Sequence, residues 1–192
     1  MAAPAQISAN KCCGGYNRRY KHASSTLHCD MTFTVYFPPA ADETAASPTK
    51  VPVLYYLSGL TCTDENVIQK SGWCWLLRQR HSRQVEEWRM YDYITKELPA
   101  LLAASFPTLD TATASIMGHS MGGHGALTLA LKNPGAYKSL SAFSPICNPC
   151  NVPWGVKAFT GYFGACTCCV HAMDSSHRVD QCCRLQISAV AC

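Results

Sequence analysis

One short stretch of this sequence places a serine where it could act as a nucleophile. Gly118-His119-Ser120-Met121-Gly122 has the spacing G-x-S-x-G, with a β-prone run, Thr113–Met117, before it and a helix-forming run, Ala126–Lys132, after it. A sharp turn from strand to helix strains the serine backbone and presents its hydroxyl above the sheet. The sequence therefore predicts Ser120 as an acyl-transfer nucleophile, and the alternative is a glycine-rich turn that contains an incidental serine.

Such a nucleophile needs backbone N–H groups that stabilise the oxyanion of a tetrahedral intermediate. The amide of Met121, directly after the serine, is the first predicted donor. The second is the amide of Leu60, in the segment Ser58–Thr63 that follows the β-prone run Val51–Leu57. Gly59 would let this backbone approach a substrate closely.

The catalytic acid and base are harder to find in the sequence. His119 and His124 flank the serine, but a base must reach the nucleophile from another loop, so both are expected to be structural. Near the C-terminus, Asp174 and His177 follow the serine in the order acid then base. They lie three residues apart on one local turn, and His171 and Asp180 are no better placed. The sequence therefore predicts no complete acid–base pair.

The elements around these residues alternate between strands and helices. Met31–Phe37 alternates apolar residues with threonine and predicts a half-buried strand, whereas Val51–Leu57 predicts a central strand that is buried on both faces. Met90–Ser105 has helical spacing despite Pro99, and Ser139–Phe143 predicts the next strand. This rhythm is typical of an α/β sheet with parallel strands.

Composition excludes several other classes of protein. The 192 residues suffice for one domain, and their 48% hydrophobic and 15% charged residues are typical of a globular protein. A formal charge of +4 without a basic block argues against nucleic-acid binding. No apolar run is long enough to cross a membrane, and the first ten residues do not resemble a secretory signal, so a cytoplasmic location is expected.

Several long segments resemble the S-formylglutathione hydrolase family, also called the esterase D family. Val53–Asn66 is similar to its oxyanion segment, Gly118–Leu127 to its nucleophile turn, and Ser141–Pro149 with Trp154-Gly155 to the stretch that follows. Two further segments, Arg89–Tyr93 and Lys96–Pro99, are most similar to plant members. The resemblance covers roughly Gln6–Gly72 and Val85–Gly164.

This resemblance implies an α/β-hydrolase sheet flanked by helices. It also implies a serine thioesterase that converts S-formylglutathione to glutathione and formate, as part of formaldehyde detoxification. Family members need no metal or other cofactor and are commonly dimers. The expected partner is therefore a glutathione thioester, with a second copy of the chain in a homodimer.

The chain departs from the family in two places. A short arginine-rich segment, residues 73–84, stands where the family has a longer one with a further strand, so a central strand is expected to be missing. Residues 165–192 form a cysteine-rich tail unlike the family, which carries its acid and base there, so the esterase domain is expected to span residues 1–164. Both departures have the form of altered splicing, a shifted reading frame or a gene-model error. The alternative function is thus a catalytically dead, truncated isoform that lacks the triad Asp and His.

A cysteine-rich metal-binding module is a less favoured alternative. The chain has 13 cysteines, and Cys147 and Cys150 have the spacing of a ligand pair. The other candidate ligands are Cys166, Cys168, Cys169, His171, Cys182 and Cys183. They are irregularly spaced, whereas a closed zinc site usually has two matched pairs of ligands. No metal is therefore expected.

Overall fold

The computed structural model describes most of the first three quarters of the chain. The described residues are 3–42, 46–59, 62–64, 78–80 (backbone only), 89–147 and 152–157. Residues 1–144 form one compact unit and residues 145–192 a second. In the described part of the second unit, residues 153–157 are helical, and the Gly155 N–H donates to the Val152 carbonyl at 3.0 Å. Within the described residues, no helix combines the length and apolar character needed to span a bilayer.

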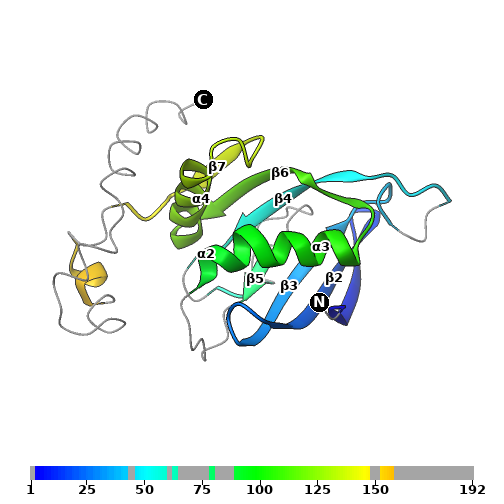
Figure 1. The fold of residues 1–192 in the computed structure, drawn as a ribbon, viewed down its shortest axis with the longest axis horizontal. Coiled ribbons are helices and arrows are strands. Elements are labelled where there is room, and N and C mark those ends of the chain that lie inside the picture. The colour runs from blue at the N-terminus through cyan, green and yellow to red at the C-terminus, as the bar shows by residue number, and fades with distance from the viewer. Residues whose placement is uncertain are drawn as a thin grey trace. The chain divides into compact units, whose positions relative to one another are not determined.

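The first unit begins with an antiparallel meander of three strands (Figure 1): β1 (Ala5–Cys12), β2 (Gly15–Ser24) and β3 (Cys29–Phe37). The two-residue turn Cys13-Gly14 joins β1 to β2 with φ angles of 47° and 80°. Positive φ at both central residues is the geometry that matches the twist of a hairpin. The strand expected at Met31–Phe37 lies within β3, but the expectation that it is half-buried was wrong, because all of these residues except Thr32 are buried. Strands β1 and β2 were not predicted.

A second, parallel sheet has the strand order β4-β6-β7. Its strands are β4 (Val51–Leu57), β6 (Leu109–His119) and β7 (Leu140–Phe143), and helix α4 (Met121–Lys132) connects β6 to β7. Strand β6 lies between the other two, with α4 packed beside it (Figure 1). The predicted parallel α/β arrangement is therefore confirmed for these strands.

One helical segment spans residues 90–105, as predicted from its spacing. It consists of α2 (Met90–Asp92), a π-helical turn η1 (Tyr93–Glu97) and α3 (Leu98–Ser105). The Leu98 N–H donates to the Tyr93 carbonyl, five residues back. This wider turn directly precedes Pro99, which has no N–H and cannot fit a regular helix interior. The π turn thus lets the helix continue through the proline.

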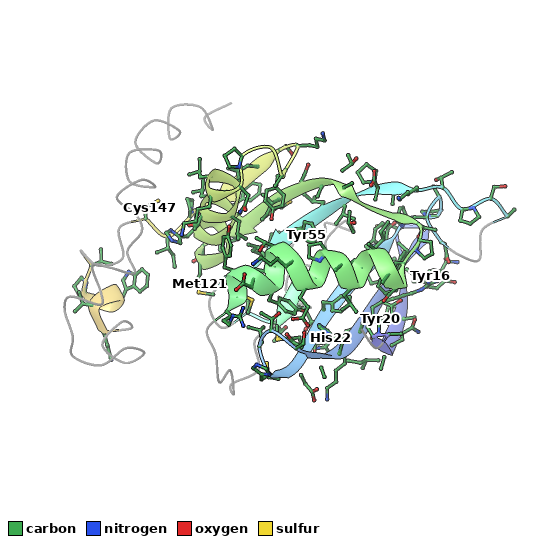
Figure 2. The ribbon with its side chains drawn as sticks, in the orientation of Figure 1. Tyr16, Tyr20, His22, Tyr55, Met121 and Cys147 are labelled. Carbon is green, nitrogen blue, oxygen red and sulfur yellow. The ribbon has the colours of Figure 1, made fainter. Side chains whose placement is uncertain are left out.

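The core lies between this helical segment and both sheets. Phe33 of β3, Tyr55 of β4 and Leu102 of α3 are buried in a single apolar cluster. The rings of Tyr20 and Phe106 lie 4.9 Å apart, which packs β2 against the end of α3. His22, labelled with Tyr20 in Figure 2, stacks on Tyr93 of the same helical segment with ring centroids 5.7 Å apart.

Within the described residues, the strands form two sheets that are not paired with each other. Strand β3 belongs to the sheet β1-β2-β3-β5, and β4 to the other sheet. Among the described residues, the short strand β5 (Arg78–Arg80) extends the first sheet beyond β3, through three antiparallel residue pairs. Strand β5 lies inside the arginine-rich segment 73–84, and the absence of a central strand there stays a prediction because most of that segment is outside the described residues.

Glu97 ties the helix to the turn between β2 and β3. Its carboxylate accepts hydrogen bonds from the Ser24 hydroxyl at 2.9 Å, the Ser25 N–H at 3.0 Å and the Thr26 N–H at 2.8 Å. Burial raises the pKa of Glu97, but these hydrogen bonds outweigh burial and lower the pKa below its ordinary value. The ionised carboxylate therefore stabilises the fold.

Replacing Glu97 by glutamine tests this contribution. We expect Glu97→Gln to lower the free energy of unfolding by about 1–3 kcal/mol at pH 7, because the amide cannot accept all three bonds. A depressed folded-state pKa gives stability that is present above the unfolded pKa of about 4.3 and lost as pH falls through the folded pKa. Urea unfolding from pH 7 to pH 3 should therefore show the two proteins converging in acid. A constant difference would contradict the assignment.

Candidate active site

Ser120 lies at a strained turn between β6 and α4. Its backbone has φ 56° and ψ −119°, a conformation that non-glycine residues rarely adopt. Two hydrogen bonds hold this backbone: the Ser120 N–H donates to the Phe143 carbonyl at 2.9 Å, and the Ser120 carbonyl accepts from the His124 N–H at 3.1 Å. The Ser120 side chain makes no capping hydrogen bond to the helix. The residue predicted as nucleophile thus sits at a turn held from both sides.

Neither glycine of the G-x-S-x-G sequence has space beside it for a side chain. A Cβ atom on Gly118 would collide with the Gly122 carbonyl across the turn. A Cβ atom on Gly122 would collide with the Leu57 carbonyl at the end of β4 and lie 2.6 Å from the Ser58 carbonyl oxygen. The close approach of strand and helix expected from these glycines is confirmed.

The loop after β4 reaches the serine. The position of a Cβ atom on Gly59 lies 3.4 Å from Ser120 Cβ and 3.6 Å from His119 Nδ1. Within the loop, the Cys62 N–H donates to the Gly59 carbonyl at 3.3 Å. The predicted donor Leu60 falls between these residues in sequence but outside the described residues.

The other predicted donor, Met121, is the first residue of α4 (Figure 2). The N–H groups in the first turn of a helix have no intrahelical acceptor, and they carry the positive end of the helix dipole. The Met121 side chain is 42% exposed, so the start of α4 is open to solvent. An amide at this position can stabilise a developing negative charge.

The described residues do not supply an evident catalytic base. His119 is exposed and lies beside Gly59, and His124 is half-buried one turn into α4. Burial, followed by the neighbouring Tyr137, raises the pKa of the Tyr55 hydroxyl far above its ordinary value, so Tyr55 stays protonated at neutral pH. The tail candidates lie outside the described residues: His171, Asp174, His177 and Asp180.

The metal hypothesis falls mostly on residues that the structure does not describe. Cys150 and every tail cysteine lie outside the described residues, and Cys147 is exposed and not part of a disulfide. Among the described residues, no three His, Cys, Asp or Glu side chains gather as a metal site would require. The hypothesis therefore gains no support from this part of the chain.

Sequence reasoning missed one polar cluster next to the site. Asp64, at the end of the loop that contains Gly59, is fully buried and contacts Arg19 of β2 and Thr34 of β3. The local signal was an acidic residue five positions after the glycine that follows the apolar strand. Its partners could not be predicted because β2 was not recognised as a strand.

A strained serine between a parallel strand and a helix, beside the loop of the neighbouring strand, defines an esterase of the α/β-hydrolase class. The esterase family model matches residues 24–85 and residues 77–182.

Three relatives specify the family further. The chain is 47% identical to the S-formylglutathione hydrolase of Arabidopsis thaliana, over 83% of this chain and 67% of the relative. It is 43% identical to that of Bos taurus, over 91% of this chain and 72% of the relative. The structure of the Agrobacterium tumefaciens S-formylglutathione hydrolase superposes with a TM-score of 0.67 at 38% identity, covering 84% of this chain and 69% of that one. The chain belongs to the S-formylglutathione hydrolase family.

The comparisons also contain an internal gap. The alignment with the Arabidopsis enzyme spans 194 positions, whereas 83% of 192 residues is about 159, so about 35 positions of the alignment have no counterpart in this chain. The two matches of the family model meet at residues 77–85. The first observation indicates that residues are missing from this chain, and the second puts the junction of the two matches at residues 77–85.

Proposed function

We propose that this chain is a serine thioesterase in which Ser120 is the nucleophile and the amides of Met121 and Leu60 form the oxyanion hole. The observation that carries the proposal is the positive φ of Ser120 at the β6–α4 turn, beside the loop of Gly59. Backbone strain of this kind is typical of functional sites, because the surrounding contacts must maintain it.

The proposed substrate is S-formylglutathione, as the names of the relatives indicate. The Ser120 Oγ attacks the formyl carbon, and the C–S bond breaks to release glutathione. Water then cleaves the formyl ester on Ser120 and releases formate. A thiol has a pKa of about 8.5, so its thiolate leaves with little protonation, and the main need is a base that takes the serine proton.

A catalytically dead isoform is the second candidate function, and the missing residues favour it. The two family-model matches join at residues 77–85, after β4, and the tail candidates for acid and base lie outside the described residues. A serine without its base keeps only the weak rate enhancement that oxyanion donors and binding provide. Under this proposal the chain would fold and bind the thioester without turning it over.

The remaining expectations are proposals drawn from the family resemblance. They are a cytoplasmic location, a homodimer, and a reaction that needs neither a metal nor another cofactor.

Hydrolysis of S-formylglutathione by the purified full chain tests the main proposal. We expect saturable release of glutathione and formate in equal amounts, above the spontaneous rate. The control is Ser115→Ala, which removes a hydroxyl from β6, the strand that leads to Ser120. Ser115 accepts a hydrogen bond from the Ser139 hydroxyl at 2.9 Å. This control should keep the wild-type rate. A chain that unfolds cooperatively but does not exceed the spontaneous rate would instead support the dead isoform.

A further inference from the structure

The loop that approaches Ser120 is anchored at its far end by a buried ion pair. Asp64 is 0% exposed. Its Oδ2 accepts from Arg19 Nε at 2.6 Å and its Oδ1 from Arg19 Nη2 at 2.8 Å, so the guanidinium is bound through two parallel bonds. The Thr34 hydroxyl donates to Oδ2 at 3.0 Å. Such bidentate, charge-assisted bonds fix orientation as well as distance.

The two partners of Asp64 form a rigid platform. Arg19 and Thr34 are directly opposite each other in the register of β2 and β3. Nine consecutive residue pairs join these two strands, and Thr34 is itself buried. A carboxylate held by both residues therefore has little freedom to move relative to the sheet.

The same loop is fixed at its other end by the nucleophile turn. Leu57, the last residue of β4, pairs with Gly118 of β6, and its carbonyl lies against Gly122 of α4. Gly59 then passes beside Ser120, and the Cys62 N–H closes a turn on the Gly59 carbonyl. The loop between Leu57 and Asp64 is thus held at both ends, with the approach to Ser120 between them.

From this arrangement we propose that Asp64 is a positioning residue, which acts with Arg19 and Thr34 to hold the loop of Gly59 against Ser120. Burying an acidic residue is costly unless it is paired and hydrogen-bonded, and here all three contacts are supplied by the other sheet. Because β3 and β4 are not paired, the cluster links the nucleophile sheet to the N-terminal meander. The kinetic part of this proposal rests on the proposed thioesterase function; the structural part does not.

Hydrogen–deuterium exchange of the peptide that covers residues 58–64 tests the structural part without turnover. We expect Asp64→Asn to raise its exchange rate about tenfold, since local openings that the anchor suppresses become accessible. Asp42→Asn is the matched control, because Asp42 is also buried and forms an ion pair at 2.8 Å with Arg18, the residue before Arg19 on β2. The control should destabilise the chain while leaving this peptide unchanged.

The kinetic part predicts a separation of kcat from KM. Asp64→Asn should lower kcat for S-formylglutathione by about tenfold to a hundredfold with KM little changed, because a displacement of about 1 Å in a catalytic group costs this much. Asp42→Asn should change neither parameter. Thr34→Val should show a smaller loss of the same kind, and Thr34→Ser, which keeps the hydroxyl, should restore the wild-type value.

The outcomes separate the two proposals. If Asp64→Asn does not fold, the comparison of Thr34→Val with Thr34→Ser decides the question. Equal exchange of residues 58–64 in Asp64→Asn, Asp42→Asn and the wild type would overturn the positioning role, as would equal kcat losses in the two Asp variants. If the wild-type chain shows no turnover, the proposed function fails, and the exchange measurement still decides whether Asp64 holds the loop.

Discussion

Replacing Ser120 by alanine is expected to lower the turnover of S-formylglutathione by at least about a thousandfold, because the loss of a serine nucleophile removes the covalent pathway. The substitution should leave the fold unchanged, since the Ser120 side chain makes no capping hydrogen bond to α4. Alanine also removes only the hydroxyl and leaves the backbone bond to the Phe143 carbonyl possible.

The informative comparison is with Ser115→Ala, five residues earlier on β6. Initial rates of thioester cleavage at saturating substrate should be near wild type for Ser115→Ala and near the spontaneous rate for Ser120→Ala. The thermal midpoints of both variants should stay within a few degrees of wild type, since neither side chain is a core residue. If Ser120→Ala retains most of the wild-type rate, Ser120 is not the nucleophile.

Gly122→Ala should produce a large loss of stability for the addition of a single methyl group. The added Cβ would collide with the Leu57 carbonyl, which is held in β4 by the pairing of Leu57 with Gly118. Since both groups belong to paired or helical backbone, neither can move without disturbing the turn at Ser120. We expect a loss of about 3 kcal/mol in the free energy of unfolding, at the upper end of the usual cost of overpacking.

Gly125→Ala is the matched control for this prediction. It lies on the same helix, and its Cβ would come 3.3 Å from the flexible end of the Leu57 side chain, Cδ1. Alanine also favours a helix over glycine by up to about 1 kcal/mol, so this variant should be neutral or slightly stabilised. Urea unfolding of both variants measures the difference. Equal stabilities for Gly122→Ala and Gly125→Ala would show that α4 does not pack on β4 as described.

The parts of the fold with a strong local pattern were predictable. The limits of β4 were predicted at Val51–Leu57 because a buried central strand is a continuous apolar run bounded by turn residues. The helical segment 90–105 was also predicted, although its π turn before Pro99 was not. Strands β6 and β7 and helix α4 were predicted with errors of a few residues at their ends.

The N-terminal hairpin was not predictable by the same reasoning. Strand β1 is exposed along most of its length, so no apolar face marks it in the sequence. Strand β2 carries charged residues at buried or half-buried positions, where partners from distant segments satisfy them, as Asp42 does for Arg18. Such pairs depend on the tertiary fold, and local patterns do not contain them.

For the candidate site, the local motif predicted the turn at Ser120 but not the contacts from distant segments that hold it. The G-x-S-x-G spacing predicted the strained serine and the two close glycine contacts. The Phe143 carbonyl that holds the Ser120 N–H comes from β7, and the Asp64 anchor depends on the register between β2 and β3. These contacts join segments far apart in sequence, so only the structure could identify them.

Active-site labelling with a fluorophosphonate, read by mass spectrometry of the tryptic peptide Glu97–Lys132, tests the central claim most directly. We predict one phosphonyl adduct that fragmentation places on Ser120, that excess S-formylglutathione suppresses, and that Ser120→Ala abolishes while Ser115→Ala retains it. An adduct on another residue, or no adduct on a folded chain, would contradict the assignment of Ser120 as an activated nucleophile.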